Sequence, residues 1–228
     1  MVKTNLLEGR RVVARVSSPV NGELEVIKDL AFGTYIHGGG LPQSGGLAEE
    51  IWKSTLNRVK DLPAQAGQES RRVKGCLIVG LGGGSIAKLV RKNWKDAKIT
   101  GVDVDPVIVE LGKKYMKLDK QNVNIIIGDA YKLITNYQLL IPSGYDLICF
   151  DTYVGADFPK KFESVLFLRQ VKKLLSEDGI AIFNRLYGPE DRDDAIKFES
   201  NLMEVFPEVT RLYPEANIMF VCSQQDVK

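Results

Sequence analysis

The chain has 228 residues, and 44% of them are hydrophobic, so it is long enough to bury one good-sized core. Its 31 basic and 29 acidic residues give a formal charge of only +2 without a basic stripe, which argues against nucleic acid or an anionic membrane as a partner. There is no Cys-x-x-Cys pair, no secretory leader and no apolar run of about 18 residues, so we expect a cytoplasmic protein without a metal ion or a membrane span.

Residues 1–45 are expected to form a small antiparallel β-sheet region. Apolar and polar residues alternate there in three runs, as they do in half-buried strands. Asn21-Gly22 separates the first two runs and predicts a hairpin, because both residues tolerate a positive φ. The runs are Arg11–Val16, Glu23–Ile27 and Phe32–Ile36. This small sheet is also a candidate surface for a homodimer.

A glycine-rich segment and a helix follow the small sheet. For His37–Gly46 two interpretations stay open, namely a wall or lid of a binding site and a plain linker. From Gly46 to Lys60 apolar residues recur at helical spacing, and Pro63 with a polar stretch ends the helix. We assign residues 46–228 to the main domain.

From Arg72 onward, predicted strands and helices alternate, which is typical of a mostly parallel sheet covered by helices on both faces. Asp105-Pro106 is a typical helix start, and Gly179 is expected to end a helix with a C-terminal turn. Each of the three cysteines lies in a predicted strand and is expected to be buried and reduced. The expected strands are Gly75–Val79, Ile99–Val102, Val123–Ile127, Tyr145–Phe150, Ile180–Phe183 and a closing antiparallel pair, Val209–Tyr213 and Asn217–Cys222. The expected helices are Ser85–Trp94, one from Asp105, Phe162–Leu175 and Asp191–Val205.

The stretch from Cys76 to Asp105 has the pattern of strand, glycine turn, helix, strand and carboxylate. Glycines at the turn let backbone N–H groups approach a ligand, and Asp103, about 20 residues on, can bind the two hydroxyls of a ribose. A dinucleotide motif would have a third glycine where Ser85 stands, which argues against NAD and FAD. The stretch therefore predicts a site for a nucleoside-bearing cofactor.

Four of the predicted parallel strands end in polar side chains. In an open α/β sheet, ligands bind beyond the carboxyl ends of the strands, near the point where the strand order reverses. A single aspartate at a strand end is often a simple turn cap, but three of them beside a glycine loop indicate one shared site. The residues are Asp103, Asp129, Asp151 and Asn184.

Five segments between Arg72 and Gly188 carry a family resemblance. They read CLIVGLGGGS, GVDVDPVIVELGKKYM, NIIIGDA, YDLICFDTYVG and LLSEDGIAIFN. Together they resemble the S-adenosylmethionine-dependent methyltransferase fold and, within it, the spermidine synthase group of aminopropyltransferases. The resemblance implies a Rossmann-like α/β fold with a mostly parallel seven-stranded sheet, S-adenosylmethionine or its decarboxylated form as cofactor, and no metal.

The resemblance also implies which positions hold the cofactor. They lie on the glycine loop and at the ends of the next two strands. Gly80, Gly82 and Gly84 would face the amino-acid or aminopropyl part, Asp103 the ribose hydroxyls, Val104 the adenine face, and Asp129 with Ala130 the adenine edge.

On the acceptor side, the resemblance puts Asp151 at the reaction centre. There it would help to remove a proton from the attacking amine, because a carboxylate attracts an ammonium and accepts its proton once water is excluded. Gln43, Thr152 and Tyr153 would contact the acceptor.

The chain departs from the spermidine synthase pattern in three places. Gly83 and Val154 stand where that group has aspartates, and its Tyr-His-Glu motif is absent from Gly46–Trp52. Because a dication such as putrescine normally needs several converging carboxylates, an ordinary putrescine-using spermidine synthase is not expected. The candidate replacement carboxylates are Glu49, Glu50 and Asp157. A solvated helix face is the simpler interpretation of the two glutamates.

Three functions remain to be weighed. The first is a transferase that moves a methyl or aminopropyl group from the cofactor to a small acceptor such as an amine. The second is a non-catalytic nucleoside- or partner-binding protein that keeps the fold. The third is a nicotinamide-dependent oxidoreductase, against which Ser85 and the two strands after the last helix argue.

Overall fold

A computed structural model describes residues 9–61 and 70–224. The break in composition expected at Pro63 lies outside these residues, and so do the first eight residues of the expected N-terminal region. The division at residue 45 stays a prediction.

The main element is a seven-stranded sheet with the order β10-β11-β9-β8-β5-β6-β7. The last five strands of this order, β9, β8, β5, β6 and β7, pair in parallel, whereas β11 is antiparallel to both of its neighbours. The prediction of a mostly parallel sheet with a closing antiparallel pair is therefore confirmed. The strands are β5 (Gly75–Val79), β6 (Lys98–Asp103), β7 (Val123–Ile127), β8 (Tyr145–Phe150), β9 (Leu175–Leu186), β10 (Glu208–Leu212) and β11 (Asn217–Ser223).

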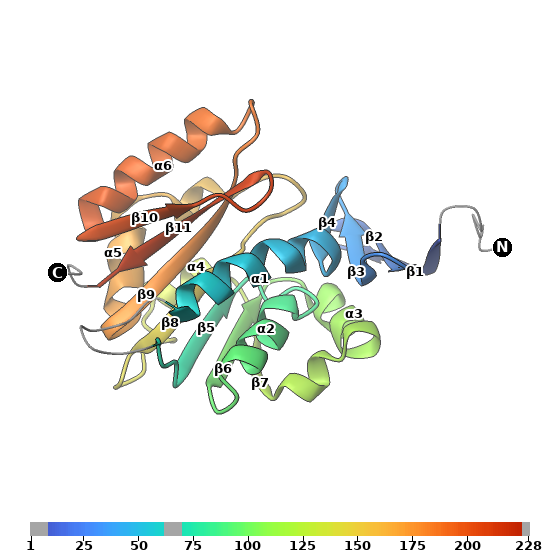
Figure 1. Cartoon of the computed structure of the whole chain (residues 1–228), viewed down its shortest axis with the longest axis horizontal. Coiled ribbons are helices and arrows are strands. Elements are labelled where there is room, and N and C mark those ends of the chain that lie inside the picture. Colours follow the sequence, from blue (N-terminus) through green and yellow to red (C-terminus); the bar gives the residue numbers. More distant parts are fainter. Residues whose placement is uncertain (1–8, 62–69, 225–228) are drawn as a thin grey trace.

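Helices cover both faces of this sheet (Figure 1). Side chains of a strand alternate between the faces, so Cys76 and Ile78 of β5 pack in one hydrophobic cluster while Leu77 and Val79 pack in the other. The first cluster includes side chains of α1 (Gly46–Asp61), α2 (Ser85–Asn93) and α3 (Pro106–Met116). The second includes those of α4 (Ala130–Thr135), α5 (Val165–Leu174) and α6 (Arg192–Val205). No helix in the described part of the chain is long and apolar enough to span a membrane.

The three cysteines lie on strands β5, β8 and β11 of this sheet. Cys76, Cys149 and Cys222 are buried and form no disulfide, as expected from their apolar surroundings in the sequence.

A separate four-stranded antiparallel sheet precedes α1. Its order is β1 (Arg10–Ser18), β2 (Gly22–Asp29), β3 (Gly33–Gly38) and β4 (Leu41–Ser44). The hairpin predicted at Asn21-Gly22 is confirmed, because Ser18 pairs with Gly22 across the turn.

Strand β4 lies within His37–Gly46, so this segment is not a plain linker. Gly39 and Gly40 both have positive φ and turn the chain back, so that Leu41 pairs with Gly38. Pro42 is tolerated because β4 lies at the edge of its sheet.

The end of α5 also differs from the prediction. The helix runs only from Val165 to Leu174, and Leu175 is already extended, with φ −76° and ψ 145°. The next residues form the start of β9 instead of a left-handed helix end. Gly179 is needed there for another reason: a Cβ at that position would lie 2.5 Å from the carbonyl oxygen of Tyr145 in the neighbouring strand.

Asp105 joins the two sheets. Its Oδ1 accepts a hydrogen bond from the backbone N–H of Val107 at 2.8 Å and so caps α3, as predicted. Its Oδ2 accepts from Ser18 Oγ at 2.6 Å and from Asn21 Nδ2 at 2.5 Å. Because Asp105 is fully buried, the β1–β2 turn is held firmly against the end of β6.

Candidate active site

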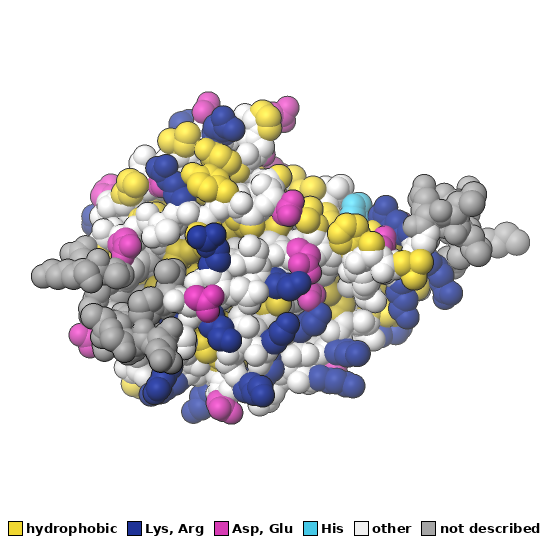
Figure 2. Space-filling view, in the orientation of Figure 1, with side chains coloured by type: hydrophobic (Ala, Val, Ile, Leu, Met, Phe, Trp, Pro, Cys, Tyr) yellow, Lys and Arg dark blue, Asp and Glu magenta, His cyan; other side chains and the backbone are white. Residues whose placement is uncertain are grey.

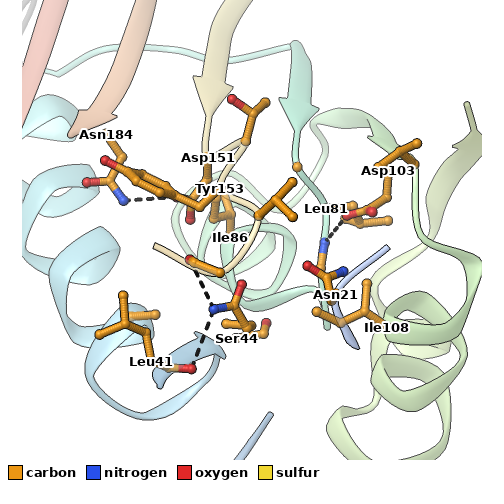
Figure 3. A pocket seen from close by; sticks show the side chains of 18 of the residues that line it. Asn21, Leu41, Ser44, Leu81, Ile86, Asp103, Ile108, Asp151, Tyr153 and Asn184 are labelled. Atoms are coloured by element: carbon orange, nitrogen blue, oxygen red, sulfur yellow. Dashed lines mark hydrogen bonds between the residues drawn. The ribbon is translucent and has the colours of Figure 1, made fainter. Parts of the chain in front are cut away.

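A cavity of about 280 Å³ opens at the carboxyl ends of the central strands (Figure 3). It lies where β5 is flanked by β6 on one side and β8 on the other, which is the point where the strand order reverses. β4 and α1 supply the opposite wall. The polar residues predicted at the strand ends, Asp103, Asp129, Asp151 and Asn184, all line this cavity.

The glycine loop after β5 forms one wall. Gly80 has a φ of +88°, and a Cβ there would lie 2.0 Å from the carbonyl oxygen of Asp151, so only glycine lets the loop cross the end of β8. Gly82 also lines the cavity, and its N–H donates to Oδ2 of Asp103 at 2.7 Å. Gly84 does not line the cavity: it precedes α2, where a Cβ would lie 2.5 Å from the side chain of Leu118.

Asp103 lies at the end of the cavity that also holds Asn21 and Ile108 (Figure 3). Burial raises the pKa of Asp103, and hydrogen bonds from the N–H groups of Gly82 and Asp105 partly oppose that rise. A carboxylate has about four acceptor sites, so acceptor capacity remains for ligand hydroxyls. The next residue, Val104, lines the cavity and is 48% exposed, which leaves apolar surface for a flat ring.

Asp129 is paired with a lysine that the sequence did not reveal. Lys161 Nζ lies 3.0 Å from Oδ1 and 2.9 Å from Oδ2 of Asp129, and the Tyr131 N–H donates to Oδ1 at 2.9 Å. Burial alone would raise the pKa of Asp129, but the hydrogen bond and charge of Lys161 outweigh it, and the pKa is lowered. Ala130 and Lys161 line the cavity beside Asp129.

Asp151 lies at the other end of the cavity, with Tyr153 and Asn184 (Figure 3). Trp52 Nε1 donates to its Oδ2 at 2.7 Å, and Asn184 Nδ2 donates to its Oδ1 at 2.9 Å. Asn217 Nδ2 in turn donates to Oδ1 of Asn184 at 2.7 Å, which fixes the orientation of that amide. Burial raises the pKa of Asp151 to about 6, against the opposing effect of the hydrogen bonds from Asn184 and Trp52.

The three residues predicted to contact the acceptor line the same cavity. The Thr152 hydroxyl is buried and has no hydrogen-bond partner among the residues that the structure describes. Tyr153 accepts a hydrogen bond on its hydroxyl from the Leu186 N–H at 2.6 Å, and burial raises its pKa. Gln43 Nε2 donates to the carbonyl of Gly38 at 3.0 Å and to that of Gly155 at 3.3 Å, so its amide ties β4 to the segment after β8.

The two positions without the expected aspartates have different surroundings. A Cβ at Gly83 would lie 2.5 Å from Met116 Sδ and 2.9 Å from Ile36 Cδ1, so a larger residue there requires both side chains to move. Val154 lines the cavity with an apolar side chain. The candidate replacements do not compensate, because Glu49, Glu50 and Asp157 are not among the residues that line the cavity.

Several site residues were not identified from the sequence. Trp52 was assigned only to the apolar side of a helix, and its indole N–H faces a carboxylate ninety-nine positions away in the chain. Lys161 and Asn217 lie outside the quoted motifs, and Asn21 was read only as a turn residue. No local pattern marks these positions, since each joins the site through the arrangement of distant segments.

Comparison with known proteins identifies the family. Residues 58–227 match the model of the spermine/spermidine synthase domain. The chain belongs to this family. The predicted resemblance is therefore confirmed.

Curated proteins that are similar in sequence to this chain carry two kinds of name. The "eEF1A lysine and N-terminal methyltransferase" of Mus musculus is 29% identical over 155 residues, which cover 64% of this chain and 22% of the relative. A "polyamine aminopropyltransferase" of Vibrio vulnificus is 30% identical over 109 residues, which cover 47% of this chain and 36% of the relative. The chain thus spans only about a fifth to a third of the length of these curated relatives.

Solved structures confirm the fold of this spermine/spermidine synthase family member. A probable spermidine synthase from Corynebacterium glutamicum superposes with a TM-score of 0.74 at 19% identity, over 95% of this chain and 82% of that chain. Human methyltransferase-like protein 13, in complex with SAH, superposes with a TM-score of 0.60 at 24% identity, over 78% of this chain and 82% of that chain. The Rossmann-like methyltransferase fold is therefore shared.

Proposed function

We propose that the protein is a transferase that uses S-adenosylmethionine or its decarboxylated form and moves a methyl or aminopropyl group to a small amine. One observation carries the proposal: Asp103 and Asp151 line a single cavity, with Gly80 and Gly82 of the glycine loop beside them. Membership of the spermine/spermidine synthase family and the names of the relatives support it. We place this activity in the cytoplasm.

The residues present suit a nucleoside with a charged tail. Asp103 has acceptor capacity left for the ribose hydroxyls, and Val104 exposes apolar surface for the adenine face. When bound, such a cofactor supplies a carbon made electrophilic by its positive sulfur. Gly80 and Gly82 allow close approach of the tail to the backbone.

Asp151 is proposed to act on the attacking amine. An amine attacks only when it is neutral, and a carboxylate with a pKa near 6 attracts the ammonium form and accepts its proton. Trp52 and Asn184 each donate to one of its oxygens and so hold the carboxylate in one orientation. β4 and α1 wall the cavity on the side away from the sheet and limit the access of water.

Asp129 and Ala130 are the proposed contacts of the adenine edge. Lys161 already binds both carboxylate oxygens of Asp129. An adenine amino group that donates to Asp129 therefore has to share or displace one of these contacts. Lys161 is consequently part of the proposed nucleoside site.

A protein amine is a second candidate acceptor. It is favoured by the mouse and Drosophila relatives whose names include "eEF1A lysine and N-terminal methyltransferase". Two labelled donors are used, S-adenosylmethionine tritiated in the methyl group and decarboxylated S-adenosylmethionine tritiated in the aminopropyl group. Incubation of each donor with either a panel of free amines or a cell extract depleted of small molecules distinguishes the two acceptors. Label in small products supports the first candidate, and label in protein supports the second.

The primary test is binding. S-adenosylmethionine, decarboxylated S-adenosylmethionine or methylthioadenosine is expected to raise the melting temperature, whereas NADH is not. Absence of a shift with all three nucleosides contradicts the proposal. Product analysis then separates the reactions, because methyl transfer leaves S-adenosylhomocysteine and aminopropyl transfer leaves methylthioadenosine. Ligand stabilisation without any product, with free amines or protein, indicates the non-catalytic alternative.

A further inference from the structure

The end of the cavity around Asp151 contains one carboxylate and otherwise uncharged walls. Among the described residues that line the whole cavity, the charged side chains are Asp103, Asp129, Asp151 and Lys161. Asp129 is neutralised by Lys161, and Asp103 lies at the opposite end with Asn21 and Ile108 (Figure 3). Beyond a bound nucleoside, whose ribose would occupy Asp103, a ligand therefore contacts a single carboxylate.

The walls near Asp151 are largely apolar. Leu41 of β4, Leu47 and Ile51 of α1, Val154 and Leu186 all line the cavity. Leu47 is 41% exposed and Val154 is 38% exposed, so both present apolar surface that no other part of the described chain covers. Hydrophobic side chains are also visible on the surface around β4 and the start of α1 (Figure 2). This end of the cavity suits an apolar group.

The two glutamates of α1 are engaged elsewhere. Glu49 forms an ion pair with Lys88 at 2.6 Å, and Glu50 forms one with Lys53 at 2.9 Å. The Glu49 side chain is only 19% exposed and pairs with Lys88 of α2, and neither glutamate lines the cavity. Neither glutamate offers a second negative charge to a ligand.

We infer that the acceptor is a monoamine, with one amino group near Asp151 and an apolar chain or ring against Leu47 and Val154. This inference rests on the proposed transferase function and names the class of its acceptor. One ammonium is offset by one carboxylate, whereas the second ammonium of a diamine would lose its hydration against apolar walls without a counter-charge. A free alkylamine or arylalkylamine and the side chain of a lysine share this chemistry.

The test compares n-hexylamine with cadaverine, which has the same number of non-hydrogen atoms and a second amine in place of the terminal methyl group. The protein is saturated with the nucleoside that stabilises it most, and each amine is titrated calorimetrically. Hexylamine is expected to bind at least about tenfold more tightly. Equal or tighter binding of cadaverine overturns the inference, and so does the absence of hexylamine binding. An N-acetyl-lysine amide, titrated in parallel, binds more tightly than hexylamine if the acceptor is a lysine side chain.

A matched pair of variants tests the physical cause. Val154→Asp adds a carboxylate at the mouth of the cavity, and Val154→Asn adds the same shape without the charge; both keep the backbone hydrogen bonds between positions 154 and 157. The aspartate variant is expected to bind cadaverine at least about tenfold more tightly than the asparagine variant. Equal cadaverine affinity in the two variants overturns the argument from charge.

The failure of the inference can be told from the failure of the proposed function. If no nucleoside binds, the proposed function fails, and the same two amines are titrated into the protein alone. If a nucleoside binds and hexylamine has no advantage over cadaverine, the transferase proposal stands and the monoamine inference fails.

Discussion

Trp52 of α1 donates a hydrogen bond from its indole Nε1 to Oδ2 of Asp151, at 2.7 Å. The helix that covers the cavity is thus attached directly to the carboxylate at the end of β8. Because Trp52 is almost completely buried, this contact is not in competition with bulk water. Helix packing and the ionisation of Asp151 are therefore coupled.

The substitution Trp52→Phe tests this coupling. It keeps an aromatic ring but removes a donor that lowers the pKa of Asp151, so that pKa is expected to rise further above 6. The acid limb of the pH profile of kcat/KM, which reports the free enzyme, is expected to move to higher pH. A profile that keeps its wild-type midpoint contradicts this coupling.

Trp94→Phe is the matched control for that experiment. The Trp94 indole N–H donates to the carbonyl of Arg71 at 2.9 Å and has no contact with Asp151. Both tryptophan variants are expected to lose about 1–3 kcal/mol of stability, but only Trp52→Phe is expected to shift the pH profile.

Asp151→Asn is expected to slow transfer by at least about 100-fold, since an amide cannot accept the proton of the acceptor amine. The affinity for the nucleoside, measured by calorimetry, is expected to stay within about threefold of wild type, because Asp103 and the glycine loop are unchanged. Unchanged turnover would remove Asp151 from the mechanism.

The same variant predicts a dependence of stability on pH. The pKa of Asp151 is about 6 when folded and 3.8 in the unfolded reference, so the folded protein binds this proton more tightly. The stability that the group contributes is present below pH 4 and is lost as the pH rises to about 6, at most roughly 3 kcal/mol. The unfolding free energy of wild type relative to Asp151→Asn, measured by urea titration, should fall over this interval. A constant difference between the two proteins would contradict the raised pKa.

Asp103→Ala is expected to weaken nucleoside binding by at least about 100-fold, because two hydrogen bonds to a charged acceptor are lost. An analogue without the two ribose hydroxyls provides the control in a double-mutant cycle. This analogue should bind the wild-type protein weakly, and its affinity should fall little further in the Asp103→Ala variant. A full additional loss with the analogue would show that Asp103 acts on something other than the ribose.

Lys161→Met is expected to sharpen the choice of base. Lys161 binds both oxygens of Asp129. Its ammonium can also donate to the oxygen that inosine carries in place of the adenine amino group. Without it, Asp129 is free to accept from an amino group and repels an oxygen. The ratio of adenosine to inosine affinity is expected to rise by about tenfold, measured by calorimetry. An unchanged ratio would place Lys161 outside base recognition.

The sequence predicted those parts of the site that depend on neighbouring residues. Gly80 and Asp103 belong to a single strand-turn-helix-strand unit, and the spacing within that unit determines their positions. Gly179 shows the limit of such reasoning. The sequence pattern predicts that it ends a helix, but a glycine is needed there because the carbonyl of Tyr145 in a neighbouring strand lies too close for a Cβ.

The contacts that tune the site could not be predicted in this way. Trp52 reaches Asp151, and Lys161 reaches Asp129, across long separations in the chain. From the sequence pattern alone, Trp52 fits an apolar helix face and Lys161 fits a solvated turn. Only the packing of α1 and of the segment before α5 on the sheet brings these side chains to the carboxylates.

Asp105 has a consequence for how the chain can be divided. Its Oδ2 accepts from Ser18 and Asn21 of the small sheet, while its backbone N–H donates to Oδ1 of Asp103. Asp103, the carboxylate proposed to bind the ribose, therefore lies two residues before a buried polar junction between the β1–β2 hairpin and the end of β6. Trimming the chain at residue 45 would remove both side-chain donors of the buried Asp105, next to the proposed cofactor site, so we expect the main domain to lose the geometry of this site without the small sheet.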